Sequence, residues 1–416
     1  MSDILAPTRT PAFEQRLKKR YAAERRFRLA GLGAIVLSIA VLLFLLVTMT
    51  INGIGGFQRA QLAVPVDFSE VGLSLSPGLQ DRNAAIRSLE GQGIADVVRF
   101  NVERAYGEQA AAQINSEAWR QVAAEVADNP QLLNGQAEFG LPISDRLATA
   151  LSGDGQLELQ PLARELADRG ALTKRFDFGF LTRSDATDAQ QVGIWGALKG
   201  SILTMLVTLI LAFPIGVLAA LYLEEYAPKN RWTDIIEVSI NNLAAVPSII
   251  FGLLGLAVFL WLFPNFRSAP LIGGMTLALM TMPVIVISGR NAIKAVPPSI
   301  RDGAMALGAS PVQVVFHHVL PLALPGILTG TIIGMARALG ETAPLLMIGM
   351  RAFVATPPGG LTDPATVLPV QIFLWSDEIS RGFVERTSAA IIVLLLFLLL
   401  MNGVAIYLRN RFEKKW

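Results

Sequence analysis

The sequence predicts an all-α polytopic membrane protein with six transmembrane helices, and three observations lead to this fold class. Hydrophobic residues make up 52% of the 416 residues and charged residues only 16%, whereas soluble domains usually carry about 25% charged residues. Six stretches are apolar and long enough to cross a bilayer, which takes about 20 helical residues. Lysines and arginines gather beside the first and the last stretch, as they do on the cytoplasmic side of membrane proteins.

The six spans follow a basic segment at 1–28. The first is expected at 29–51, and its apolar core and leading polar segment are both too long for a secretory signal peptide. We therefore interpret it as a membrane anchor. The other five form a transmembrane core over 195–408, with spans at about 195–223, 241–263, 269–289, 321–349 and 388–408, followed by a tail at 409–416.

The basic residues in the short flanks set the expected orientation. Those before the first span are Arg9, Arg16, Lys18, Lys19, Arg20, Arg25, Arg26 and Arg28, and those after the last are Arg409, Arg411, Lys414 and Lys415. Both termini are therefore expected in the cytoplasm. The loops at 224–240 and 290–320 then face the cytoplasm, while 52–194 and 350–387 face outward.

The segment at 52–194 is a polar insertion between the first two spans. It lacks an apolar run of membrane length and carries more acidic than basic residues. Apolar residues recur at helical spacing over 83–106 and 143–153, which predicts a small, mainly helical extracytoplasmic domain at about 60–172. Its carboxylates are scattered, so a solvated surface is expected there rather than a catalytic site.

Several kinds of chemistry are excluded by composition. The chain has no cysteine, which rules out disulfides and Cys-ligated zinc. Its two histidines, His317 and His318, are adjacent and form no spaced metal cluster. No G-x-x-x-x-G-K-[ST] stretch is present, so the chain cannot bind ATP through a P-loop of its own. We expect no cofactor, no metal and no catalytic residue.

The loop at 290–320 is predicted to contain two short helices. Ser299 can cap the first, with Asp302 completing an S-x-x-D variant of the capping box. Gly308 suits the left-handed residue that ends this helix. The stretch Ser310–Gln313 can open the second helix through another capping box, with proline at the first helical position.

The small residues between 303 and 309 let another protein approach this loop closely. A plain structural connector is the alternative interpretation. DNA binding is a poor one, because a loop tethered between two spans cannot reach a groove freely, and no nucleic-acid partner is expected.

The spacing of this loop resembles the EAA motif of ATP-binding-cassette (ABC) importer permeases, E-A-A, three residues, G, nine residues, I-x-L-P. Asp302, Gly303 and Ala304 stand at E-A-A, Gly308 at the glycine, and Leu320 and Pro321 at L-P, with His318 at the isoleucine position. The resemblance implies a cytoplasmic coupling-helix loop that docks into a separate ATPase subunit. ATP hydrolysis is then expected in that partner.

Further stretches resemble the PstA-type phosphate permeases within this family. They are FDFGFLT (176–182), YLEEYAP (222–228), NNLAAVPSIIFGLLGLAVF (241–259), GETAPLL (340–346) and LPVQIFLW (368–375). The resemblance implies phosphate import across a bacterial inner membrane. It also implies three kinds of partner: a homologous PstC-type permease, a PstB-type ATPase dimer and an extracytoplasmic PstS-type phosphate-binding protein.

The stretch MARALGETAPLL, from Met335 to Leu346, places two charges in the fifth expected span. Arg337 and Glu341 are four residues apart and would share one face of a helix. Counted at 1.5 Å per residue from Leu322, they lie about 22 Å and about 28 Å along it. A charge in hydrocarbon costs a few kcal/mol, so both are expected to face protein or a water-filled cavity.

Two interpretations of this pair are open. It can be a structural ion pair, or two side chains that snorkel to the outer interface. Alternatively it belongs to the substrate pathway, where Arg337 binds an anion through its planar guanidinium and Glu341 competes for the same donors. Thr204 and Thr208, four residues apart on the second span, either line that pathway or bond to their own backbone.

Two other functions compete with phosphate import. The first is a permease for another oxyanion, such as sulfate, molybdate or phosphonate. The second is a membrane sensor or scaffold that acts through the extracytoplasmic domain. An intramembrane enzyme is disfavoured because no Ser/His, Asp/Asp or metal arrangement is present.

Overall fold

The computed structural model describes residues 11–69, 72–75, 81–151, 157–350 and 353–412. The chain divides into two compact units, Met1–Asn52 and Gly53–Trp416. The described residues of the first unit belong to the helix α1 (Pro11–Gly56), which contains the whole of the first expected span and whose last turn, 53–56, is counted with the second unit. Among the basic residues used for the orientation, Arg9, Lys414 and Lys415 lie outside the described residues.

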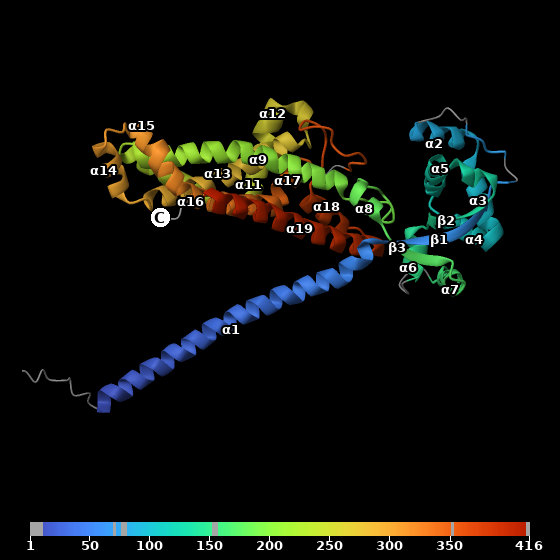
Figure 1. The fold of residues 1–416 in the computed structure, drawn as a ribbon, viewed down its shortest axis with the longest axis horizontal. Coiled ribbons are helices and arrows are strands. Elements are labelled where there is room, and N and C mark those ends of the chain that lie inside the picture. The colour runs from blue at the N-terminus through green and yellow to red at the C-terminus, as the bar shows by residue number, and fades with distance from the viewer. Residues whose placement is uncertain (1–10, 70–71, 76–80, 152–156, 351–352, 413–416) are drawn as a thin grey trace, which may run out of the picture. The chain divides into compact units, whose positions relative to one another are not determined.

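The second unit contains the transmembrane core (Figure 1). Its long helices are α9 (Trp195–Leu221), α13 (Pro270–Lys294), α16 (Leu320–Gly340) and α19 (Arg381–Phe412). In the described part of the chain, five helices are long and apolar enough to cross a membrane, or six if one bent pair counts as a span. The predicted all-α polytopic fold is confirmed.

The bent pair corrects the third expected span, because 241–263 is not one helix. The helix α10 (Arg231–Ala244) ends before Pro247, and the chain resumes as α11 (Ser248–Leu254), η3 (Gly255–Phe259) and α12 (Leu260–Leu262). The two arms, Arg231–Ala244 and Ser248–Leu262, meet at 104°. Proline has no amide hydrogen and disfavours a helical conformation in the residue before it, so the helix breaks at this point.

The fifth expected span is also broken. The helix α16 stops at Gly340, Glu341 is extended (φ −80°, ψ 117°), and a separate short helix α17 covers Ala343–Met347. The cause is Pro344, because its ring would clash with the carbonyl of Gly340 four residues earlier and it offers no hydrogen-bond donor. Arg337 and Glu341 are therefore not on one continuous helix.

Close packing at small residues holds the core together. A Cβ built on Gly274 of α13 would lie 2.4 Å from Val207 of α9, and one on Gly330 of α16 would collide with Ser288 of α13. Such small residues let backbones approach closely, which is how helices associate in a membrane. Two further elements of this region are η4 (Pro264–Phe266) and α18 (Leu368–Ser376). The LPVQIFLW stretch forms α18.

The polar insertion folds around a three-stranded antiparallel sheet with the order β2-β1-β3. Its strands are β1 (Gln58–Asp67), β2 (Gln136–Pro142) and β3 (Leu172–Phe176), with Val64 opposite Phe139 and Ala60 opposite Lys174. Around the sheet lie α2 (Arg82–Gly91), α3 (Ile94–Tyr106), α4 (Glu108–Ala112), α5 (Ala118–Asp128), η1 (Pro130–Asn134), α6 (Asp145–Leu151) and α7 (Gln160–Asp168). The helical spacing predicted over 83–106 is confirmed as two helices, α2 and α3, and that over 143–153 is confirmed for 145–151, with 152 and 153 outside the described residues. The sheet was not predicted.

Strand β1 is the core of this domain. Ala60, Leu62, Val64 and Val66 alternate along it and are all buried, as expected for one face of a strand. Pro65 is tolerated because β3 pairs with β1 only up to Leu62, so β1 is an edge strand beyond that point. A short helix, α8 (Phe178–Thr182), then leads from β3 toward α9.

Candidate coupling loop and translocation site

The loop before α16 is built from three short elements. They are α14 (Pro298–Ala306), α15 (Pro311–Gln313) and the wider π-helical turn η5 (Val314–Val319). The expected cap at Ser299 is wrong, because the helix begins at Pro298 with Pro297 in the capping position and no side-chain cap bond. Proline is favoured at the first helical position, so the Pro297-Pro298 pair starts this helix without a polar cap.

The end of α14 and the start of α15 agree with the prediction. Gly308 adopts the left-handed region (φ +90°), and the amides of Gly308 and Ala309 donate to the carbonyls of Met305 and Ala304. This is the Schellman arrangement that closes a helix at a glycine. The capping box between Ser310 and Gln313 is present in full. The two helices are therefore joined by a fixed, tight turn.

The tip of the loop is apolar and open to solvent. The side chains of Met305, Leu307, Val312 and Phe316 are 49%, 92%, 56% and 45% exposed, and we call them the loop tip. Single exposed apolar residues are common, but four of them on one short loop make it a candidate interaction surface.

The residues at the motif positions differ in their exposure. Asp302, Gly303 and Gly308 are exposed, whereas Ala304 is buried within the loop, and Leu320 and Pro321 are half-buried at the start of α16. The first three can therefore contact a partner, and the other three support the loop from within.

A charged clamp that the sequence analysis did not single out holds this loop. Arg301, next to Asp302, donates from Nη2 and Nε to Glu225 Oε1 at 2.7 and 3.2 Å. It also donates to the carbonyls of Val296 and Ile293 at 2.7 and 3.0 Å. Glu225 lies in η2 (Tyr222–Tyr226), the wide turn that continues α9. The paired glutamates of the YLEEYAP stretch were the available signal for this contact.

The other glutamate of that stretch forms a second set of ion pairs. Arg290 of α13 contacts Glu224 at 3.4 Å and Glu237 of α10 at 2.9 Å, and Lys294 contacts Glu224 at 3.6 Å. These pairs tie the ends of α9, α10 and α13 together beside the loop. Arg290 uses a separate donor for each glutamate, so its guanidinium links the two carboxylates.

Arg337 and Glu341 face each other across the break after α16. Arg337 Nε lies 3.6 Å from Glu341 Oε1, and the two side chains are 47% and 21% exposed. The pair is therefore not enclosed in the core of this subunit. The 47% exposed fraction of Arg337 leaves part of its side chain uncovered by this subunit.

The two threonines occupy a different environment. Thr204 and Thr208 are 1% and 0% exposed. The Thr208 hydroxyl lies 2.9 Å from the Thr204 carbonyl and 3.3 Å from the Gly274 carbonyl of α13. They are packed between two helices, and the structure does not bring them together with Arg337 and Glu341 in one exposed site.

Three arginines and an aspartate meet where the insertion joins the core. Arg386 of α19 is 2% exposed and donates to the carbonyls of Ala189 and Gly56 and to Asp177 Oδ2. Arg183 donates to the same Asp177 oxygen at 2.6 Å. Burial, and then the neighbouring Arg183, lowers the pKa of the Arg59 guanidinium to about 10. Arg59 therefore remains charged at neutral pH.

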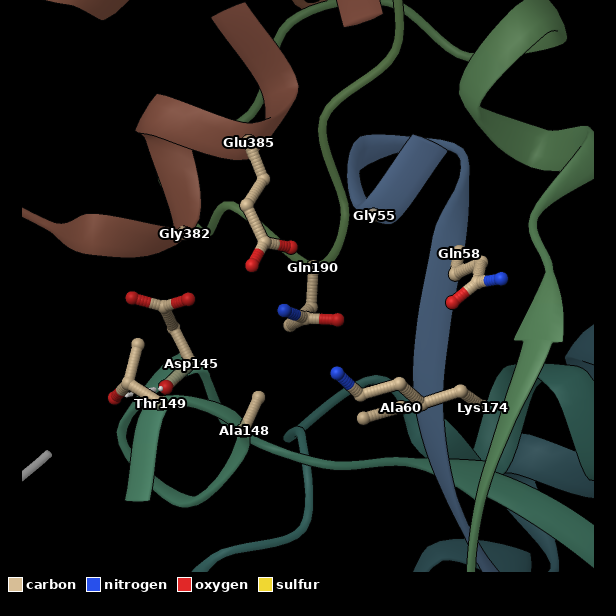
Figure 2. Close-up of a pocket in the computed structure, with 10 residues that line it drawn as sticks. All are labelled: Gly55, Gln58, Ala60, Asp145, Ala148, Thr149, Lys174, Gln190, Gly382 and Glu385. Carbon is tan, nitrogen blue, oxygen red and sulfur yellow. Dashed lines mark hydrogen bonds between the residues drawn. The ribbon is translucent and has the colours of Figure 1, made fainter. Parts of the chain in front are cut away.

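A small polar cavity lies beside this cluster (Figure 2). Its volume is about 30 Å³, and Asp145, Lys174, Gln190 and Glu385 are among the residues that surround it. The Oε1 atom of the buried Gln190 and Oδ1 of Asp145 have no hydrogen-bond partner among the described residues. The space holds about two water molecules, which would satisfy these atoms.

The comparisons with known proteins agree with this architecture. Residues 196–415 match the family described as binding-protein-dependent transport system inner membrane component, and residues 14–160 match a domain of unknown function, DUF3333. The phosphate transport system permease protein PstA of Yersinia pestis is 32% identical over 224 residues, which cover 54% of this chain and 73% of that protein.

Two further relatives extend this likeness. The PstA protein of Haemophilus influenzae is 32% identical over 56% of this chain and 80% of its own length. A Bacillus subtilis protein named probable ABC transporter permease protein YqgI is 30% identical over 58% of this chain and 86% of its own length. With more than half of its residues inside the matched region, the chain belongs to the family of binding-protein-dependent transport system inner membrane components, the multi-pass permease subunits of ABC importers.

Proposed function

We propose that this chain is the phosphate-translocating permease subunit of an ABC importer. The transport role is supported mainly by the segment Asp302–Gly308, an exposed short helix that ends in a tight turn at Gly308. Another protein can dock against such a segment. Phosphate as the substrate is supported by the two relatives that are named phosphate transport system permease protein.

ABC importer permeases work with an ATPase and a substrate-binding protein. We propose that the partners here are of the PstB and PstS types, with a PstC-type permease as the second half of the pore. Both termini and the loop tip would then face the cytoplasm, and the insertion domain would face outward, in accordance with the basic flanks. ATP-driven closure of the partner would move the loop and switch the pore between its two orientations.

Arg337 is proposed as the anion-binding group of the pathway. It is 47% exposed in this subunit, which favours a role toward a cavity or the second permease over a purely internal ion pair. A guanidinium matches the oxygens of phosphate through two parallel donors. Glu341, 3.6 Å away, would take over those donors when the anion leaves.

Uptake of radiolabelled phosphate at low concentration tests this function. Cells lacking the gene would carry the wild type, Arg337→Ala, Arg337→Lys or the surface control Arg87→Ala, with membrane levels compared by blot. We expect the alanine variant to lose uptake, the lysine variant to retain part of it, and the control to match the wild type. Full uptake by Arg337→Ala would overturn the role of this residue. Stronger competition by sulfate, molybdate or phosphonate than by unlabelled phosphate would assign a different oxyanion.

A further inference from the structure

A second, larger pocket lies at the base of the insertion domain, beside Arg59 and Arg183 of the buried charge cluster, and the proposed transport function does not use it. Its volume is about 320 Å³. It is formed by the start of β1, the first turn of α5, the end of β2 and the segment that leads toward α9. The residues that surround it are Arg59, Asn115, Glu117, Arg120, Gln121, Pro142, Arg183 and Gln191.

Arg59 is the unusual member of this lining. It is only 9% exposed, and its Nε has no hydrogen-bond partner within the described residues. A buried arginine normally engages its donors fully, because an unpaired charge away from water is costly. Arg59 borders the pocket, and the carboxylates that act on it, Asp177 and Asp188, form no ion pair or hydrogen bond with it among the described residues, so its guanidinium has unused donors beside that space.

The charges around the pocket are unbalanced toward positive. Arg59, Arg120 and Arg183 line it, against the single carboxylate of Glu117. Glu117 is paired with Arg120 at 3.1 Å, and both are about half exposed at the mouth of the pocket. Arg183 is held at the inner end by Asp177 at 2.6 Å. The excess positive charge therefore sits at the buried end, around Arg59.

The polar neighbours are already engaged, and Arg120 and Arg183 are each paired with a carboxylate, so Arg59 is the guanidinium that keeps an unpaired donor among the described residues. Asn115 Nδ2 donates to Asp188 at 2.9 Å, and Gln121 Nε2 donates to the carbonyl of Gly140 at 3.1 Å. The carbonyl of Gln191 accepts from Arg183 Nε at 2.9 Å. A ligand that meets this surface must offer several acceptor oxygens and negative charge.

We propose that this pocket binds a small oxyanion of the phosphate and sulfate class, held by Arg59 together with Arg120 and Arg183. Planar guanidinium donors match the oxygens of such an anion. The neighbouring cavity of Figure 2, at about 30 Å³, is too small for one. Because Arg59 lies on β1 and Arg183 on the segment before α9, the bound anion would bridge the insertion domain to the core.

This proposal does not depend on phosphate import, because the pocket lies outside the transmembrane helices. Its test uses the full-length chain purified in nanodiscs, with inorganic phosphate as the probe and chloride at equal ionic strength as the reference. Hydrogen exchange over 58–67 and 183–191 reports on the pocket itself. The variants are Arg59→Met and Arg120→Gln, with Arg87→Met as the surface control and Arg337→Ala as the pathway control.

Phosphate is expected to slow exchange in both segments of the wild type and of the two control variants by about tenfold at saturation, and to have no effect in Arg59→Met. If Arg59→Met fails to accumulate, Arg120→Gln should weaken the effect of phosphate by raising the half-saturating concentration severalfold. The proposal would be overturned by a wild type whose exchange ignores phosphate and sulfate alike. It would equally be overturned by loss of protection in Arg337→Ala with Arg59→Met unaffected.

Discussion

The ion pair between Arg301 and Glu225 allows a test of the proposal that this loop responds to an ATPase partner. The perturbation is a double-mutant cycle that combines Arg301→Lys with Glu225→Gln. Lysine keeps the positive charge but replaces the planar fork with a single point of attachment. Glutamine keeps the shape of glutamate and removes its charge. The cycle therefore isolates the contact between the two side chains.

The size of the effect follows from the bonds that are lost. Arg301 donates to Glu225 and to the carbonyls of Val296 and Ile293, and hydrogen bonds to charged groups contribute about 1.5–3 kcal/mol each when well formed. Both side chains are partly screened, with Arg301 21% and Glu225 12% exposed. We therefore expect Arg301→Lys to weaken the attachment of the loop by about 3 kcal/mol. The coupling energy between positions 301 and 225 in the cycle should be about 1–2 kcal/mol.

The assay is ATP hydrolysis by the complete importer in nanodiscs, stimulated by the loaded binding protein. Arg301→Lys should lower the stimulation by about tenfold or more, since about 1.4 kcal/mol corresponds to one factor of ten. Glu225→Gln should lower it less, and the double variant should be little worse than Arg301→Lys. The matched control is Arg82→Lys, whose partner Asp128 is 58% exposed, and which should leave stimulation unchanged.

Strict additivity of the two changes would refute the clamp, because independent residues do not share a coupling energy. A fall in melting temperature with full stimulation would refute its role in transmission and leave only a structural one.

Three further changes test other parts of the structure. Gly308→Ala forces a left-handed residue to carry a Cβ, which costs about 1–2 kcal/mol; ATPase stimulation should fall, and Gly308→Asn should retain more of it. Gly252→Ala places a Cβ 2.6 Å from the backbone of α17 and should lower the melting temperature by several degrees, whereas Gly403→Ala, which meets open space, should not. Asp177→Asn removes the carboxylate that Arg386 contacts and should destabilise the chain by about 3 kcal/mol or more in thermal unfolding, because a buried charge loses its partner; an unchanged melting temperature would contradict the ion-pair account.

Much of the transmembrane core could be predicted because its signals are local. Apolar length defines the spans, and the turn at Gly308 and the capping box at Ser310 are set by residues within one helical turn of each other. The predictions were wrong where a proline sets the position at which a helix ends or begins. Pro247 and Pro344 each break an expected span, and the Pro297-Pro298 pair starts α14 in place of a Ser299 cap.

The insertion domain was harder to predict because its sheet forms between strands that are far apart in the sequence. The alternation of Ala60, Leu62, Val64 and Val66 is visible in the sequence, but it lies directly after a long apolar helix and includes a proline. Its partners β2 and β3 are about 75 and 110 residues further on, and no local pattern connects them. The same holds for the buried arginines, whose acidic partner becomes visible only once the chain is folded.

The helix α9 connects the loop to the junction with the insertion domain. Its first residue, Trp195, is bonded through its amide to the carbonyl of Arg183 at 2.9 Å, beside the buried charge cluster. Its other end continues into η2, where Glu225 accepts a hydrogen bond from Arg301 of the loop. At 1.5 Å per residue the helix separates these ends by about 40 Å, and it packs closely on α13 where Val207 meets Gly274, with Pro214 inside the helix. We therefore expect a displacement of the loop to reach the junction with the insertion domain through α9.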